Sequence, residues 1–255
     1  MEIVFLGTGN AFTRQYYNSN LLIEFSQTNL LIDCGTTCPA SIESLGIDIK
    51  RIDNVFISHL HADHVGGLEE LAIKHRYIYQ KKPNLYVPAR LQNDIWQHTL
   101  RGGLEFTVDG RVGIEYYFEL HVVKDSFSIE NKTFEIIPTL HIPGMPSYGI
   151  FFDGIFFTND TVFQRALIER MLEKSKIIIH DCSFVHNPVH AYYKELLELP
   201  KAIREKFFLI HYGDGTKEKQ KYMADQGFHI AQKHERLSFD KKNSEIGNRL
   251  QNILL

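Results

Sequence analysis

Short apolar runs, separated by glycine, asparagine and proline, set the hydrophobic pattern of the first third of the chain. Runs of this kind are typical of buried strands. They predict strands at residues 3–6, 21–25, 30–32, 55–58 and 85–87. Apolar residues at helical spacing between these runs predict helices over residues 39–45, 65–79 and 89–100.

The second half of the chain repeats this order. Apolar runs predict strands at residues 133–138, 148–152, 155–158, 176–179 and 207–210. We expect a helix over residues 161–174, capped by Thr161, and another that begins at Asn187-Pro188, with asparagine at the cap and proline at the first helical position. Strands followed by strand–helix alternation, twice over, predict two sheets covered by helices. No linker rich in glycine, serine or proline divides residues 1–255, so one domain is expected.

Residues 102–124 are the least typical part of the chain. They alternate like a hairpin and include the aromatic run Tyr116-Tyr117-Phe118. We interpret this segment as a lid or dimerisation insert, and therefore expect a homodimer. From Asp240 onward, a polar tail with an apolar end predicts a peripheral helix.

Composition excludes several classes of protein. A hydrophobic content of 44% supplies a sizeable core, and a net charge of −3 does not demand a nucleic-acid partner. The three cysteines, Cys34, Cys38 and Cys182, are too few for a disulfide framework and favour a reducing cytoplasm. The chain contains no basic signal-peptide start and no apolar run of about 18 residues, so we expect no membrane span.

One stretch concentrates metal-competent side chains. His59-Leu60-His61-Ala62-Asp63-His64 directly follows the predicted strand at residues 55–58. Loops held by a rigid sheet are where chemistry concentrates, and imidazole with carboxylate ligands suits zinc. A polar turn with helix-capping side chains is the alternative, but it leaves three histidines without a shared role.

Three later apolar runs also end in a metal-competent residue, at His141, Asp160 and His211. A single histidine or aspartate at a strand end is more often a cap or turn residue. Together with the first motif, these residues make five histidines and two aspartates, a set sufficient for two metals.

The His59–His64 motif resembles the signature of the metallo-β-lactamase superfamily. Phe5-Leu6-Gly7-Thr8-Gly9-Asn10, Asn18-Ser19-Asn20 and Leu31-Ile32-Asp33-Cys34-Gly35 resemble its ribonuclease Z branch, and the resemblance extends to about Gly215. It implies an αββα sandwich, an α/β fold of two mixed sheets back to back with helices outside and metals at one sheet edge.

The resemblance also implies a ligand set. His59, His61 and His141 would hold one metal, Asp63, His64 and His211 the other, and Asp160 would bridge them. A carboxylate can span metals about 3.5–4 Å apart, the usual two-metal distance. Redox di-iron members carry a carboxylate where this chain has His61, so two Zn²⁺ ions are expected, with Mn²⁺ as the alternative.

Phosphodiester cleavage also requires protonation of the leaving group. By the same resemblance, an acidic–histidine pair assists this step, and Asp181 and His190 occupy the corresponding positions. A carboxylate can fix the tautomer of a histidine and support its charged form. We expect His190 in the first turn of the helix that begins at Asn187, and count Asp63, Asp181 and His190 as catalytic residues.

The substrate is expected to be small. Ribonuclease Z usually carries a glycine- and proline-rich arm that grips transfer RNA, and residues 83–126 contain neither a proline-rich run nor a basic cluster. Tyr16, Tyr17 and Tyr148 are candidates for stacking on a base, and Arg14 for contact with a phosphate. This profile resembles armless ribonuclease Z-like cyclic nucleotide phosphodiesterases, including phage anti-Pycsar enzymes.

Three alternatives stay open at this stage. The first is a transfer RNA 3′-endonuclease, and the second is a thioester or lactone hydrolase of the glyoxalase II kind, which leaves Asp181 and His190 without a task. The third is a non-catalytic protein stabilised by metals, although structural zinc sites are typically closed and four-coordinate.

Overall fold

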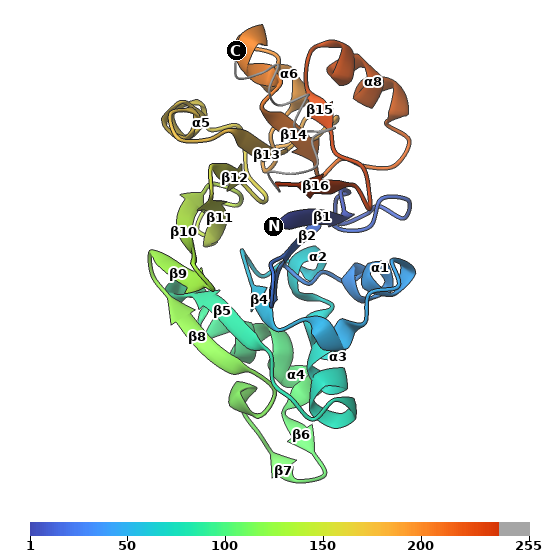
Figure 1. Cartoon of the computed structure of the whole chain (residues 1–255), viewed down its shortest axis with the longest axis vertical. Helices are drawn as coiled ribbons and strands as arrows, with labels where there is room; N and C mark the ends of the chain where they lie inside the picture. Colours follow the sequence, from blue (N-terminus) through green and yellow to red (C-terminus); the bar gives the residue numbers. More distant parts are fainter. Residues whose placement is uncertain (240–255) are drawn as a thin grey trace.

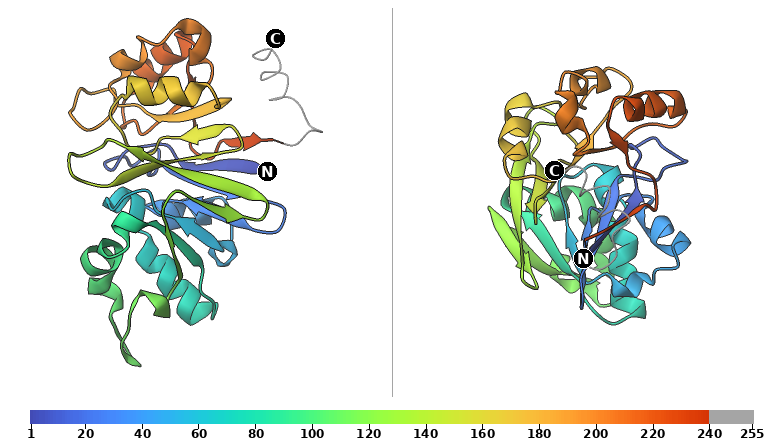
Figure 2. Two further views of the ribbon diagram at one scale, coloured as in Figure 1. Left: turned by 90° about the vertical axis from the view of Figure 1, so that its left-hand side faces the viewer. Right: turned by 45° about the horizontal axis from the view of Figure 1, so that its top comes forward.

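The computed structural model describes residues 1–239, and two seven-stranded sheets pack face to face at its centre (Figures 1 and 2). Helices cover the outer face of each sheet, as the left view of Figure 2 shows. The predicted αββα sandwich is therefore confirmed.

The first sheet has the strand order β16-β1-β2-β3-β4-β5-β8. Neighbours among β1, β2 and β3 are antiparallel, whereas β3, β4, β5 and β8 run parallel. Its strands are β1 (Glu2–Gly7), β2 (Asn20–Glu24), β3 (Asn29–Ile32), β4 (Asn54–Phe56), β5 (Asn84–Pro88), β8 (Glu119–Val123) and β16 (Arg236–Ser238). The connections between its parallel strands contain α1 (Cys38–Ser44), η1 (Ile49–Arg51), α2 (Ala62–Val65), α3 (Leu68–Ile73) and η2 (Lys74–Ile78).

The second sheet repeats the plan with the order β15-β14-β13-β12-β11-β10-β9. β9 to β12 are antiparallel neighbours, and β12 to β15 run parallel. Its strands are β9 (Ser126–Ile129), β10 (Lys132–Thr139), β11 (Ser147–Phe152), β12 (Ile155–Phe157), β13 (Ile177–Asp181), β14 (Phe207–Ile210) and β15 (His229–Ile230). The covering helices are α5 (Arg165–Leu172), α6 (Tyr193–Leu196), α7 (Lys201–Arg204) and α8 (Lys217–Asp225).

The main core lies between the two sheets and is rich in aromatic rings. Phe56 stacks on Phe127 at a centroid distance of 5.6 Å, and Phe127 stacks on Phe134 at 5.1 Å. On β13, Ile177 and Ile179 belong to this core, whereas Ile178 packs into a second cluster beneath α5. Burial of both faces explains why β13 reads as a continuous apolar run.

Two predicted helices in the first half of the chain differ from the observed ones. The helix expected over residues 65–79 is interrupted at Gly66-Gly67, where a Cβ on Gly67 would lie 2.5 Å from the carbonyl oxygen of Gly35. Residues 89–100 form a 3-10 turn, η3 (Ala89–Leu91), and a π-helix, η4 (Ile95–Leu100), which continues into α4 (Arg101–Leu104).

The hairpin predicted over residues 102–124 is much shorter. Only β6 (Phe106–Thr107) and β7 (Gly110–Arg111) form one, and it projects from the body of the molecule (Figure 1). A 3-10 turn, η5 (Ile114–Tyr116), follows it. Residues 119–123 instead pair with β5 as the edge of the first sheet, because their backbone completes a parallel ladder there.

The helices expected at Thr161 and Asn187 begin later. The Thr161 hydroxyl donates to the carbonyl oxygen of Leu140, and its amide donates to Asp181, so the chain becomes helical only at Arg165. The Asn187 side chain accepts from the amides of Val189 and His190 in a turn, and α6 starts at Tyr193. The tail helix predicted from Asp240 lies outside the described residues. Within residues 1–239, the structure has no helix long and apolar enough to cross a membrane.

Candidate metal centre and active site

The predicted metal ligands lie on the segments that follow β4, β10, β12 and β14. Non-glycine residues with positive φ occur at two of these turning points, Asn159 before Asp160 at 51° and His211 at 65°, and a third, Asp33 at 61°, follows β3. Such backbone is uncommon and collects at functional sites. The amide of His211 also donates to the carbonyl oxygen of Thr8 at 2.7 Å, which ties the second sheet to β1 of the first.

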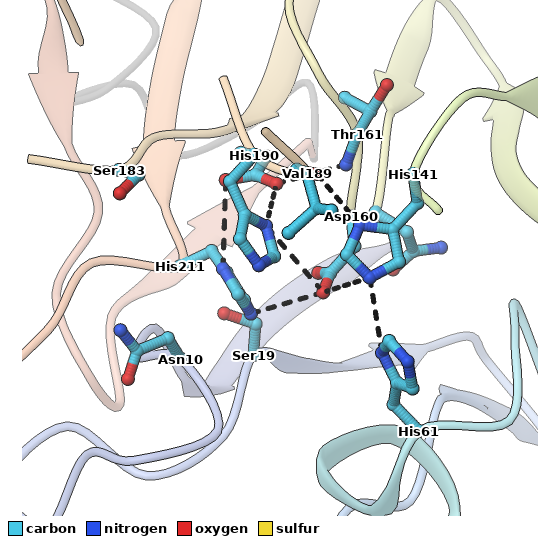
Figure 3. A network of polar contacts seen from close by, with 12 residues as sticks. Asn10, Ser19, His61, His141, Asp160, Thr161, Ser183, Val189, His190 and His211 are labelled. Carbon is cyan, nitrogen blue, oxygen red and sulfur yellow. Dashed lines mark hydrogen bonds and ion pairs between the residues drawn. The ribbon is translucent and has the colours of Figure 1, made fainter. Parts of the chain in front are cut away.

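The first group of ligand atoms combines three imidazoles with Asp160. Nδ1 of His61 lies 3.2 Å from Nε2 of His59 and 3.1 Å from Nε2 of His141. Oδ2 of Asp160 lies 3.8 Å from each of the two Nε2 atoms. Figure 3 shows the side chains of His61, His141 and Asp160 converging from separate segments.

The second group combines Asp63, His64, His211 and the same Asp160. Asp160 places Oδ1 at 3.4 Å from Nε2 of His64 and Oδ2 at 3.3 Å from Nε2 of His211. Oδ2 of Asp63 lies 3.5 Å from both of these nitrogens. Asp160 therefore belongs to both groups, and its expected role as a bridge between two metals stays a prediction.

Hydrogen bonds to groups outside the metal centre set the orientation of three of the imidazoles. Nδ1 of His64 contacts Oδ2 of Asp33 at 2.7 Å, and Nδ1 of His141 contacts the carbonyl oxygen of Val189 at 2.8 Å. Nδ1 of His59 contacts the Ser58 hydroxyl at 3.0 Å, which in turn donates to Asp33. Each of these rings therefore directs Nε2 into the centre, as metal-ligating histidines do when the other nitrogen is hydrogen-bonded.

The pKa shifts within the centre favour ionised carboxylates, which attract cations. Burial opposes the ionised carboxylates, but His211 and His64 hold the pKa of Asp160 well below its usual range. Burial likewise opposes a charged imidazole, but Asp160 and Asp181 raise the pKa of His211 to about 9. In contrast, burial and neighbouring imidazoles lower the pKa of His59 and of His61.

The residues present fit divalent metal ions. Nε2 of His64 is fully buried with no hydrogen-bond partner in residues 1–239, yet it points at two carboxylates. A buried ring nitrogen without a partner is costly unless a cation binds it. Imidazole and carboxylate donors are those preferred by zinc and related first-row metals.

A histidine outside the two groups completes the site. Nδ1 of His190 lies 2.7 Å from Oδ2 of Asp181, and the same oxygen accepts from the amide of Thr161 at 3.0 Å (Figure 3). Asp181 is buried, whereas the His190 side chain is 19% exposed. The carboxylate thus orients the ring of His190 through Nδ1.

One cavity of about 710 Å³ opens above these residues. Its lining includes His61, Asp63, His141, Asp160, His190 and His211, together with loop residues of both halves of the chain. This volume lies within the range of about 300–1,000 Å³ that is usual for small-molecule sites.

Comparison with known proteins identifies the family. The model of the Anti-Pycsar protein Apyc1 family matches residues 1–237. An Anti-Pycsar protein Apyc1 from Paenibacillus xerothermodurans is 38% identical over 247 residues, which cover 94% of this chain and 98% of the relative. The chain belongs to the Anti-Pycsar Apyc1 family.

Relatives and solved structures extend this assignment. An Anti-Pycsar protein Apyc1 from Bacillus phage 010DV004 is 36% identical to this Apyc1-family chain, over 86% of this chain and 91% of the relative. The metallo-β-lactamase fold protein YhfI from Bacillus subtilis superposes with a TM-score of 0.73 at 17% identity, over 92% and 98% of the two chains. Human tRNase Z, short form, gives 0.66 at 19% identity, over 93% and 99%. The metallo-β-lactamase fold and the resemblance to its ribonuclease Z branch are confirmed, and this Apyc1-family protein is a metal-dependent hydrolase.

The four predicted substrate residues do not line the cavity of this Apyc1-family protein. Tyr16 packs edge-on against Tyr212, with centroids 4.9 Å apart, and Tyr17 lies beneath the ammonium of Lys233 at 4.4 Å. Tyr148 is buried in β11, and Arg14 is exposed beside Asp214. The orientation of these four side chains depends on the packing of strands and loops, and the sequence pattern contains no information about that packing.

The structure places further residues at the site to which the sequence alone assigned no role. Asp33 contacts His64 and Ser58, and its only sequence signal is its place in the Leu31–Gly35 motif. Phe12 and Val185 line the cavity, and nothing in their sequence context indicates it. Of residues 102–124, none lines the cavity, so a role for this segment as a lid or dimer surface stays a prediction.

Proposed function

We propose that this Apyc1-family enzyme hydrolyses 3′,5′-cyclic mononucleotides to linear monophosphates and thereby counteracts cyclic nucleotide immune signalling. One observation carries the proposal: two groups of ligand atoms share Asp160, and the His190–Asp181 pair stands beside them in the same cavity. Membership of the Anti-Pycsar family supports this choice of substrate.

We assign two zinc ions to this centre. His59, His61 and His141 would hold one ion, Asp63, His64 and His211 would hold the other, and Asp160 would contribute to both. A set of five imidazoles and two carboxylates favours zinc over magnesium or calcium, which prefer all-oxygen sites. Bound there, the metals would supply a nucleophile by lowering the pKa of water and would stabilise negative charge on the phosphoryl group.

The protein's own residues perform the remaining chemistry. Hydrolysis adds a water oxygen to phosphorus and breaks one phosphorus–oxygen bond of the ring, so the leaving alkoxide needs a proton. Nε2–H of His190 donates that proton, and Asp181 stabilises the charged imidazole before transfer through its 2.7 Å hydrogen bond to Nδ1. The backbone amide of Thr161 donates a hydrogen bond to Asp181 and helps to fix its position.

Cavity size supports a small substrate. A space of about 710 Å³ accommodates a mononucleotide, whereas a large nucleic acid would need an extended basic surface. The net charge of −3 does not supply one. A cytoplasmic location and a homodimeric state are further parts of this proposal.

A substrate screen tests the proposal directly. The purified enzyme, with its metals counted by elemental analysis, is assayed against cyclic mononucleotides, linear dinucleotides, a thioester and precursor transfer RNA. We expect cyclic mononucleotides to be cleaved most efficiently and about two metal ions per chain, as two-metal hydrolases require. Efficient cleavage of precursor transfer RNA without cyclic nucleotide turnover would replace this function with an endonuclease, and activity on the thioester alone would remove phosphodiester chemistry.

A further inference from the structure

The outer part of the active-site cavity is apolar although it faces solvent. Three of its lining residues, Phe12, Ile142 and Val185, are large hydrophobic side chains with exposed fractions of 87%, 36% and 69%. They come from three separate loops, after β1, β10 and β13. Exposed apolar side chains gathered at one cavity mark a binding surface.

The loop that carries Phe12 is held firmly while the Phe12 ring is left uncovered. The carboxylate of Asp214 accepts from the Thr13 hydroxyl at 2.6 Å, from the Arg14 amide at 2.8 Å and from the Gln15 amide at 3.2 Å. The amide of Phe12 donates to Oδ1 of Asn10 at 3.0 Å. A fixed backbone that presents a bare aromatic ring is preorganised for a planar ligand, because little freedom is lost on binding.

A free polar group lies in the same loop. Oδ1 of Asn10 is occupied by the Phe12 amide, but Nδ2 makes no hydrogen bond within residues 1–239. Asn10 lines the cavity with Phe12, and Figure 3 shows it near His211 and the polar centre. This amide is therefore placed to donate to an acceptor on a ligand that stacks on Phe12.

We propose that Phe12 is the stacking platform for the nucleobase of the substrate, and that Asp214 is the residue that positions it. The inference rests on the proposed function and names the part of the cavity that binds the base. With the phosphate at the metal centre, the base of a cyclic mononucleotide reaches the outer, apolar part of the same cavity. Aromatic stacking binds any base through its π-face, and Val185 and Ile142 add apolar contact.

The first experiment separates base binding from phosphate chemistry. Phe12→Ala and the conservative Phe12→Tyr are compared on a 3′,5′-cyclic nucleotide and on the base-free methyl ribofuranoside 3′,5′-cyclic phosphate. For Phe12→Ala we expect KM for the nucleotide to rise roughly 10- to 100-fold, as loss of one base stack predicts. The kcat and the kinetics on the base-free substrate stay near those of the unmodified enzyme, and Phe12→Tyr restores KM.

Asp214 is tested as a positioning residue. Asp214→Ala frees residues 13–15 from their shared acceptor, so KM for the nucleotide should rise by a smaller factor with kcat unchanged. In Phe12→Trp, titration with the product monophosphate should quench the added indole fluorescence when the base stacks on it. Combining Phe12→Trp with Asp214→Ala should weaken that quenching at equal ligand concentration.

The outcomes distinguish this inference from the proposed function. An unmodified enzyme that cleaves no cyclic phosphate overturns both. A second outcome is that the unmodified enzyme cleaves cyclic nucleotides while Phe12→Ala changes KM equally on both substrates, or on neither. That result would refute base stacking on Phe12 and leave the proposed hydrolysis of cyclic nucleotides intact. Unquenched fluorescence of Phe12→Trp with saturating product also overturns the platform.

Discussion

His190 and Asp181 form a partly buried hydrogen bond of 2.7 Å between Nδ1 and Oδ2, although His190 belongs to no helix. The helix expected from Asn187 is absent at this position, and α6 begins only at Tyr193. The carboxylate therefore orients the His190 ring, and the loop turn at Asn187 places its backbone.

Replacement of His190 should affect chemistry more than metal binding. His190→Ala should keep near-normal metal content and lower turnover of a cyclic nucleotide by about 10²–10⁴-fold, the usual value of positioned proton transfer. The loss should shrink on bis-p-nitrophenyl phosphate, whose leaving group needs little protonation. His186→Ala removes an exposed histidine of the same loop and serves as the control. Equal losses on both substrates would assign His190 to binding or structure.

Asp181→Asn should show the same dependence on the leaving group, but more weakly. In the proposed mechanism Asp181 orients His190 and does not donate the proton, so part of the acid function should survive the loss of its charge. Steady-state rates on the two substrates, with metal content measured in parallel, test this. A larger loss than in His190→Ala, accompanied by loss of metal, would mean that Asp181 acts mainly through His211, whose Nδ1 lies 3.7 Å away.

Asp160→Ala should weaken both metal groups at once. Its two oxygens contact imidazoles of both groups, and among the seven proposed ligands Asp160 is the residue common to the two. We expect elemental analysis to find well under half the metal of the unmodified protein, with activity lost. Asp225→Asn, an exposed carboxylate on α8, is the control. Full metal content and activity in Asp160→Ala would refute the shared-ligand assignment.

Asp33 should affect the metal affinity of the centre although it is not itself a proposed ligand. Its Oδ2 fixes Nδ1 of His64 at 2.7 Å, and loss of such an outer partner typically costs about 10–100-fold in metal affinity or activity. Asp33→Ala should therefore lose metal to a chelator at lower chelator concentration, with His64 present but less well oriented. Unchanged competition curves would show that His64 needs no such partner.

Metal removal should reveal a pH-dependent stability. In the metal-free protein, the pKa of His211 is raised to about 9, above the ordinary histidine value of about 6.5. The folded state then binds the proton more tightly, so its stabilisation is complete below about pH 6.5 and is lost as pH rises towards 9. The melting temperature of chelated protein should fall across that interval, and that of His211→Gln should fall less. A flat profile for the chelated protein would contradict the charged imidazole.

Much of the centre was predictable from the sequence because its ligands are local in sequence or directly follow apolar runs. His59, His61, Asp63 and His64 come from one motif, and His141, Asp160 and His211 each end a buried strand run. A strand that is buried on both faces is apolar throughout, so polar residues come only after the strand ends. Adjacent parallel strands end at the same edge of the sheet, which brings these polar residues together. The nine-residue spacing from Asp181 to His190 was likewise visible in the sequence.

The sequence by itself determined the residue types, the two-sheet order and the segments that carry the chemistry. Only the tertiary structure decided which side chains face the cavity: Phe12 is 87% exposed there, whereas Tyr16 packs on Tyr212 and Tyr148 is buried. It also decided that Asp33 supports His64 and that Asp214 holds the Phe12 loop, a contact across about 200 residues of chain. The direction of a loop side chain depends on distant contacts, and hydrophobic periodicity carries information only about neighbours along the chain.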